Sequence, residues 1–176
     1  MTTLFIYSTR EGQTLKIATA IAEKLRRTGI DTKLMALSEA LNCDLRRFDS
    51  VIIGASIRYG HFDRTLATFV NRHYELLNRI PSAFFSVNLT ARKPDKNTPQ
   101  TNVYTRKFLA RIDWQPSIST VFAGALYYPR YRPFDRIMIQ FIMRLTGGET
   151  DTTKEVEYTD WHRVDAFADV LKKLLE

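Results

Sequence analysis

Short apolar segments alternate with segments of helical periodicity along the chain, and this alternation restricts the fold more than any other feature. The apolar segments have the length of strands and lack the polar–apolar alternation of a half-exposed strand. Strands of this kind are buried on both faces, which predicts an α/β fold with a parallel sheet covered by helices on each side. The predicted strands are Leu4–Tyr7, Thr32–Leu37, Ser50–Gly54, Ala83–Val87 and Ser119–Gly124.

The helical segments fill the gaps between these strands, except near the end of the chain. The 176 residues suffice for a single domain with a sizeable core. The stretch from about 125 to 153 interrupts the alternation, and Lys154–Tyr158 resumes strand-like sequence, so we predict one domain over 1–176 with an insertion. The predicted helices are Leu15–Leu25, Leu66–Leu77, Gln100–Ile112, one inside the insertion, and one from Thr159 or Asp160 to Leu175.

Cysteine content and the N-terminal sequence bear on the compartment. Cys43 is the one cysteine, which excludes an internal disulfide and a cysteine-based metal site. The histidines are scattered, and no spacing indicates a metal site of another kind. The N-terminus lacks the basic region of a signal peptide, and no apolar run is long enough to span a bilayer. We therefore expect a cytoplasmic protein.

Positive charge is concentrated in two stretches. The net charge is +7. Arg92–Arg111 contains six basic residues and one acid, and Tyr127–Gly147 contains four arginines and one acid. These two stretches account for all of the excess, which predicts a directed surface for an anionic partner rather than a uniformly basic protein.

The segment "FIYSTREGQT" (Phe5–Thr14) joins the first strand to the first helix. Ligands of open α/β sheets bind beyond the carboxyl ends of the strands, and free N–H groups at a helix N-terminus favour an anion. The loop has neither GxxxxGK[ST] nor GxGxxG, so it suits a single phosphate monoester better than a nucleoside triphosphate or a dinucleotide. A Ser/Thr helix cap without a ligand is the alternative.

Two further loops end at the same edge of the predicted sheet. They are "GASIRYGHF" (Gly54–Phe62), which contains Tyr59, and "SVNLTARKP" (Ser86–Pro94). With a flavodoxin strand order the three loops converge and can hold a phosphate and a flat ring. The alternative to a ring-binding role is that Tyr59 is an ordinary aromatic residue of a surface turn.

At this point the sequence resembles a known family. "STREGQT" is similar to the phosphate loop of flavodoxins, and "VIIGASIRYGH", "PSAFFSVNLTARKP", "TPQTN", "AGALYYPRYRPFDRIMI" and "GGETDT…YTDW" resemble the flavodoxin-like, quinone-dependent protoporphyrinogen oxidases of bacterial haem biosynthesis. The resemblance covers nearly the whole chain. It implies a doubly wound, five-stranded flavodoxin-like fold, FMN as cofactor, protoporphyrinogen IX as substrate, and menaquinone or ubiquinone as electron acceptor at the inner membrane.

The resemblance also implies which residues bind FMN. Glu11 departs from ordinary flavodoxins, where a hydroxyl residue is usual, and we expect its carboxylate to point away from the phosphate. The implied FMN residues are Ser8, Thr9, Arg10, Gly12, Gln13 and Thr14 in the first loop, Ala55, Ser56, Ile57, Arg58, Tyr59 and Gly60 in the second, and Ser86, Val87, Asn88, Leu89, Thr90, Ala91 and Arg92 in the third.

The insertion contains a predicted helix that begins at Pro133 and ends at Gly147. Its apolar face is broad, and its polar stripe is narrow. Three interpretations remain open: an internal helix covering the sheet, a contact in a homo-oligomer, or a helix lying in the interface of an anionic membrane. We favour the membrane, with tyrosines at headgroup level and arginines near phosphates or substrate propionates. The residues assigned to substrate or membrane are Tyr128, Arg130, Tyr131, Arg132, Arg136, Phe141 and Arg144.

The flavin is expected to carry the redox chemistry, so no side chain is an obligatory acid or base. Tyr59 and His61 are the weak catalytic candidates, and His61 as a polar turn residue is the more ordinary interpretation. Two alternative functions remain: a general flavodoxin or quinone reductase acting as an electron carrier, and a cofactor-free basic module that binds RNA or a membrane. We expect a peripheral protein on the cytoplasmic face of the inner membrane that does not bind nucleic acid.

Overall fold

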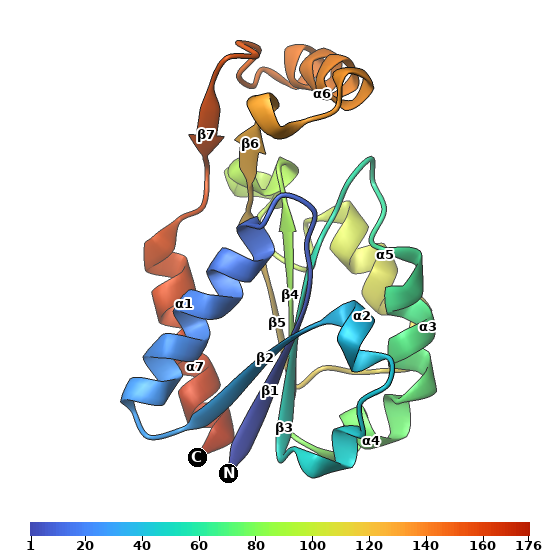
Figure 1. The fold of residues 1–176 in the computed structure, drawn as a ribbon, viewed down its shortest axis with the longest axis vertical. Coiled ribbons are helices and arrows are strands. Elements are labelled where there is room, and N and C mark those ends of the chain that lie inside the picture. Colours follow the sequence, from blue (N-terminus) through green and yellow to red (C-terminus); the bar gives the residue numbers. More distant parts are fainter.

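The computed structural model describes every residue from Met1 to Glu176 and shows a central sheet between two layers of helices (Figure 1). All five strands of the sheet are parallel, in the order β2-β1-β3-β4-β5. The predicted α/β fold and flavodoxin strand order are therefore confirmed. The strands are β1 (Thr2–Ser8), β2 (Asp31–Ala36), β3 (Ser50–Ser56), β4 (Ser82–Asn88) and β5 (Ile118–Ala123).

Helices cover both faces of the sheet, as Figure 1 shows. One face carries α1 (Gln13–Arg27) and α7 (Trp161–Leu175). The other face carries α2 (Leu37–Ala40), α3 (Arg64–Arg72), α4 (Tyr74–Arg79) and α5 (Val103–Arg111). Short 3-10 turns join these elements: η1 (Leu45–Arg47), η2 (Thr90–Arg92), η3 (Pro94–Lys96) and η4 (Tyr128–Arg130).

Each face of the sheet has its own aromatic core. Phe85, Phe122 and Phe167 meet edge to face beneath α1 and α7. On the other face Phe84 meets Trp114, whose indole N–H donates a 2.9 Å hydrogen bond to Ser82 Oγ. The apolar strands thus bury both faces, as their sequences predict.

Two predicted helices differ from the structure more than the others do. The predicted helix Leu66–Leu77 is two helices, α3 and α4, because His73 leaves the helical conformation (φ −111°, ψ 9°). The predicted helix Gln100–Ile112 begins only at Val103, since Asn102 Oδ1 accepts a hydrogen bond from Thr105 N and caps the helix.

The insertion forms a small unit above the carboxyl ends of the strands (Figure 1). β6 (Ala125–Tyr127) pairs antiparallel with β7 (Glu155–Glu157), and α6 (Pro133–Thr146) lies between them in sequence. This pairing confirms the expected strand after Lys154. The unit has its own core of Leu126, Tyr127, Tyr128, Tyr131, Ile139 and Met143.

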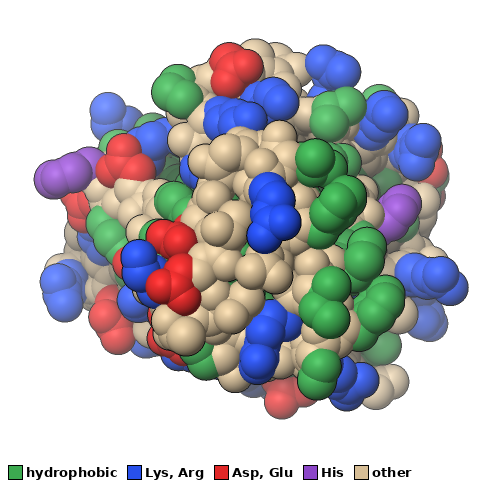
Figure 2. Space-filling model, turned by 90° about the horizontal axis from the view of Figure 1, so that it is seen from above, with side chains coloured by type: hydrophobic (Ala, Val, Ile, Leu, Met, Phe, Trp, Pro, Cys, Tyr) green, Lys and Arg blue, Asp and Glu red, His purple; other side chains and the backbone are tan.

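Most of the apolar surface of α6 faces solvent. Ile139 and Met143 are its only buried residues, whereas Phe134 and Leu145 are each 70% exposed. Figure 2, which views this end of the molecule, shows apolar side chains gathered beside basic ones. The interpretation of α6 as an internal helix covering the sheet is therefore wrong. None of the helices combines the length and the hydropathy that crossing a bilayer requires.

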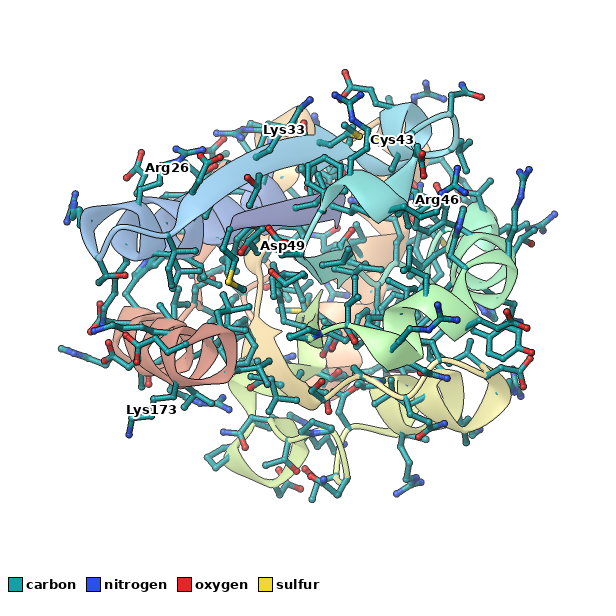
Figure 3. The ribbon with its side chains drawn as sticks, turned by 90° about the horizontal axis from the view of Figure 1, so that it is seen from below. Arg26, Lys33, Cys43, Arg46, Asp49 and Lys173 are labelled. Atoms are coloured by element: carbon teal, nitrogen blue, oxygen red, sulfur yellow. The ribbon has the colours of Figure 1, made fainter.

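The opposite end of the molecule, at the amino ends of the strands, carries charges of both signs (Figure 3). Arg26, Lys33, Arg46, Asp49 and Lys173 lie around it. Asp49 Oδ2 accepts a 2.6 Å hydrogen bond from Thr2 N and fixes the start of β1. Both chain termini lie at this end, far from α6 (Figure 1).

Candidate active site

The loop between β1 and α1 leaves several polar groups without a partner in the protein. Gly12 precedes α1 with φ +97°, a conformation that glycine adopts without strain. The backbone N–H groups of Gln13, Thr14 and Leu15 have no partner in the protein, as is usual in the first turn of a helix. Thr14 Oγ1 is also buried without a hydrogen-bond partner. A buried hydroxyl beside free amides lacks an acceptor, and a phosphate oxygen supplies one.

The side chain of Gln13 ties this loop to the insertion. Its Oε1 accepts a 2.5 Å hydrogen bond from the Tyr127 hydroxyl, while its Nε2 donates to Thr159 Oγ1 (2.9 Å) and Glu157 Oε2 (3.0 Å). The side chain is buried and fully used. Gln13 is therefore left with only its backbone N–H for a phosphate.

The loop after β3 is held in a tight turn. Arg58 and His61 exchange two backbone hydrogen bonds of 3.0 and 3.1 Å, with Tyr59 and Gly60 at the turn. Tyr59 has φ +51° and is the only residue other than glycine in the left-handed region. Its hydroxyl donates a 2.5 Å hydrogen bond to Asp135 Oδ1 in α6. Burial, together with this bond, raises the pKa of Tyr59 to about 12, so the phenol remains a donor at neutral pH.

Arg58 joins the first two loops to the insertion. Its guanidinium pairs with the carboxylate of Glu11 and lies 3.8 Å from Asp135 Oδ2. It also lies 5.1 Å from the centre of the Tyr131 ring, within range of a cation–π contact. Glu11 thus faces a cation, and its orientation away from the phosphate stays a prediction.

The loop after β4 is shaped by two buried asparagines. Asn88 Oδ1 accepts hydrogen bonds from Ala91 N (3.0 Å) and Asn102 Nδ2 (3.1 Å). Farther along the loop, Arg92 donates from Nη1 to Leu89 O (2.8 Å) and from Nη2 to Thr146 at the last residue of α6. α6 is therefore attached to two loops, through Asp135 at its start and Thr146 at its end.

The three loops surround one cavity of about 1480 Å³. Most of the residues that the sequence assigned to FMN line it. The exceptions, which do not form its wall, are Ser8, Gly12, Ala55, Ser86 and Ala91. The cavity has further lining residues that were not predicted: Glu11, Phe62, Asp63, Arg64 and Ala67, with Tyr104, Lys107, Phe108, Arg111 and Ile112 from α5 and its end, Gly124, Ala125 and Tyr127 around β6, and Met138, Ile139, Ile142, Met143 and Thr146 from α6. The periodic spacing of Tyr104, Lys107, Phe108 and Arg111 was a sequence feature that could have identified the α5 wall.

Several predictions for the insertion need correction. The tyrosines expected at headgroup level, Tyr127, Tyr128 and Tyr131, are buried in its core, and the Tyr128 hydroxyl donates to Glu149 O (2.6 Å). Of the residues assigned to substrate or membrane, only Tyr131 lines the cavity.

The four arginines assigned to this group differ in their surroundings. Arg130 pairs with Glu155 (3.0 Å) and lies over the Tyr127 ring, so it is already engaged. Arg132 and Arg144 are exposed, and Arg136 is half-buried. Phe141 is exposed on α6.

The two weak catalytic candidates line the cavity. Tyr59 and His61 both border it, and His61 is exposed.

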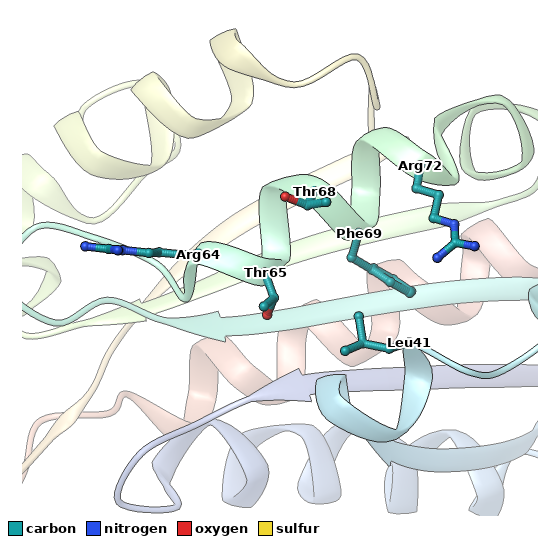
Figure 4. A pocket seen from close by; sticks show the side chains of 6 residues that line it. All are labelled: Leu41, Arg64, Thr65, Thr68, Phe69 and Arg72. Atoms are coloured by element: carbon teal, nitrogen blue, oxygen red, sulfur yellow. The ribbon is translucent and has the colours of Figure 1, made fainter.

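A second, smaller cavity of about 340 Å³ lies beside α3 (Figure 4). There Phe69 faces Leu41, while Arg64 extends away from the other side chains. Arg64 borders both cavities.

Comparisons with known proteins agree with this geometry. Residues 4–153 match the flavodoxin domain family, which indicates a flavin cofactor. The protoporphyrinogen IX dehydrogenase (quinone) of Escherichia coli (strain K12) is 52% identical over 168 residues, which cover 96% of this chain and 93% of that protein. The protein of the same name from Leishmania major is 52% identical over 166 residues, covering 94% and 72%. A flavo di-iron protein variant from Thermotoga maritima superposes with a TM-score of 0.58 at 13% identity, over 99% of this chain and 36% of that one, and supports the fold alone.

Proposed function

The chain belongs to the quinone-dependent protoporphyrinogen IX dehydrogenases of the flavodoxin domain family, and we propose that it oxidises protoporphyrinogen IX with FMN as its cofactor. A respiratory quinone, menaquinone or ubiquinone, receives the electrons, and protoporphyrin IX for haem is the product. The observation that carries this proposal is the single cavity that joins the three flavin loops to the inner side of α6.

FMN suits the site better than a dinucleotide. One phosphate fits the free amides and the unpaired Thr14 hydroxyl, and no second glycine-rich turn offers itself to a pyrophosphate. Bound in this cavity, the flavin supplies two-electron redox chemistry between the porphyrinogen and the quinone. Residues of the loops after β3 and β4 that line the cavity hold its ring.

The protein's own residues position the substrates. Ile139 and Met143 give the cavity an apolar wall on the side of α6, which suits the body of a tetrapyrrole. Arg58 and Tyr59 are held by the insertion through Asp135, so the loop beside the flavin is fixed before a substrate arrives.

α6 supports the proposal that the protein binds a membrane surface. Its exposed side carries Phe134, Ile137, Phe141 and Leu145, and exposed arginines lie near both of its ends. Apolar side chains entering the acyl region with arginines near lipid phosphates are typical of an interfacial helix. A quinone dissolved in the bilayer then reaches the cavity from the side of α6. This arrangement supports a peripheral location on the cytoplasmic face of the inner membrane.

The test is anaerobic turnover of protoporphyrinogen IX by FMN-loaded protein with a short-chain quinone. We expect porphyrin fluorescence to develop only when protein, FMN and quinone are all present. A flavin-loaded protein that passes electrons to quinone but leaves the porphyrinogen unchanged would instead be a general flavodoxin or quinone reductase. A colourless protein that does not bind FMN would overturn the redox function and favour a cofactor-free basic module.

A further inference from the structure

The cavity does not end at the flavin loops, and its extension has a distinct wall. From Gly60 it continues along α5, where Tyr104, Lys107, Phe108 and Arg111 line it. A Cβ atom added to Gly60 would lie 3.0 Å from Tyr104 Cε1, so the loop rests directly on α5. A ligand that touches the flavin ring beside Tyr59 therefore has α5 as its next surface.

Four basic side chains of this cavity have no acidic partner. Arg10, Arg64, Lys107 and Arg111 line it and form neither an ion pair nor a side-chain hydrogen bond. The two acids of the loops that line the cavity are already engaged. Glu11 pairs with Arg58, and the Asp63 carboxylate caps α3 by accepting from Thr65 N and Oγ1. The positive charge of the cavity wall is therefore uncompensated.

Lys107 and Arg111 are four residues apart on α5, so their side chains lie on the same face of the helix. Phe108 lies between them in sequence and lines the same wall. Arg64 lines the same cavity from α3, and Figure 4 shows its side chain directed away from the rest of its helix. An apolar wall bordered by unpaired cations is suited to an apolar body that carries carboxylates.

We propose that Lys107 and Arg111, together with Arg64, form the subsite for the propionate carboxylates of the tetrapyrrole. This inference rests on the proposed function and adds the residues that recognise the substrate. Anionic lipid is the other source of negative charge, but α6 and its own arginines, Arg132 and Arg144, form the surface proposed to face the membrane. Lys107 and Arg111 of α5 instead line the cavity that the three flavin loops surround.

The experiment compares protoporphyrin IX, which carries two carboxylates, with its dimethyl ester, which carries none. Binding of each to FMN-loaded protein is measured by fluorescence in the same nonionic detergent, without turnover. We expect the wild type to prefer the free acid, and Lys107→Ala with Arg111→Ala to reduce this preference by about tenfold. The matched control is Arg106→Ala, on the same helix but outside the cavity wall. The control is expected to keep the wild-type preference.

Kinetics and lipid binding provide two further readouts. For the double variant we expect a higher KM for protoporphyrinogen IX, with FMN content and KM for quinone unchanged. Binding to anionic vesicles is expected to stay at the wild-type level. Loss of vesicle binding with an unchanged preference for the free acid would show a lipid-headgroup site and overturn the proposal.

The subsite and the proposed function can fail separately. The subsite alone is disproved if the wild type oxidises the porphyrinogen and the double variant keeps the wild-type preference for the free acid. Protein that binds the free acid through Lys107 and Arg111 without oxidising the porphyrinogen disproves the function alone. Wild-type protein that neither binds nor oxidises the tetrapyrrole disproves both.

Discussion

The hydroxyl of Tyr59 lies 2.5 Å from Asp135 Oδ1 and joins the turn after β3 to the first turn of α6. These residues are far apart in the sequence, and Tyr59 occupies the left-handed region that costs a non-glycine residue of order 1 kcal/mol. A residue held in this conformation beside a proposed flavin site requires support from its surroundings. Asp135 provides part of that support from the insertion.

The contact between Tyr59 and Asp135 predicts energetic coupling. In a double-mutant cycle of Tyr59→Phe and Asp135→Ala, urea unfolding should show a coupling free energy of about 1 kcal/mol. Tyr74→Phe is the control, because its hydroxyl makes only an exposed 3.4 Å contact with Glu75. Additive effects of the two substitutions would show that the bond does not hold α6 to the loop.

Thr14→Val tests the phosphate seat. The substitution removes a buried hydroxyl that has no partner, so the free energy of unfolding of the apoprotein should stay the same or rise. FMN affinity, measured by flavin fluorescence, should fall about thirtyfold, the loss of one hydrogen bond to a charged group. Thr14→Ser keeps the hydroxyl and should retain affinity, whereas Thr14→Asp should prevent binding by charge repulsion. Equal affinities for all four proteins would place the phosphate elsewhere.

The exposed face of α6 predicts membrane binding. Ile137→Glu and Phe141→Glu should each lower partition into anionic vesicles by at least about tenfold, since each side chain gains ~1.5–3 kcal/mol on burial. Val170→Glu, at an exposed apolar position of α7, is the matched control. Point substitutions are preferable to deleting the helix, because Asp135 and Tyr131 also contact the loop after β3. If the substitutions convert a dimer to a monomer and leave vesicle binding unchanged, a second copy of the chain covers this face.

The hydrogen bonds of Glu157 predict that the folded protein loses stability in acid. Burial opposes its ionisation, but hydrogen bonds from Lys16, Trp161 and Gln13 outweigh this and hold the pKa of the carboxyl below its ordinary value of 4.5. A carboxyl whose pKa is lowered on folding stabilises the folded state above its unfolded pKa. This stabilisation is lost as the pH falls below the unfolded pKa and through the folded one. The difference in Tm between wild type and Glu157→Gln should therefore shrink between pH 7 and pH 4. Glu23→Gln, at an exposed residue without an ion pair, should show no such trend.

The sequence predicted the sheet well, because β1, β3 and β4 are continuous apolar runs whose burial needs no knowledge of their neighbours. It also placed α6 between Pro133 and Gly147, since these residues favour a helix start and end locally. It failed at His73, where a helical pattern continues across a break. Periodicity describes which side of a segment is apolar, and it does not reveal a change of direction.

The roles of side chains in the insertion were less predictable. Tyr127 and Tyr128 were expected at headgroup level, but they pack in the core of the insertion, where Gln13 and Glu149 accept hydrogen bonds from their hydroxyls. Arg130 was assigned to substrate or membrane, and the structure shows it paired with Glu155. These partners come from distant parts of the chain, so only the folded structure identifies them. Gln13 was missed as a tether for the same reason.

The position of both termini opposite α6 has a practical consequence. A biotin or affinity tag attached to Met1 or Glu176 anchors the molecule by the amino ends of its strands (Figure 1). On a sensor chip the immobilised protein then presents α6 and the mouth of the cavity to the flowing solution. Liposomes and soluble tetrapyrroles can therefore be compared on one orientation of the protein, without steric interference from the attachment.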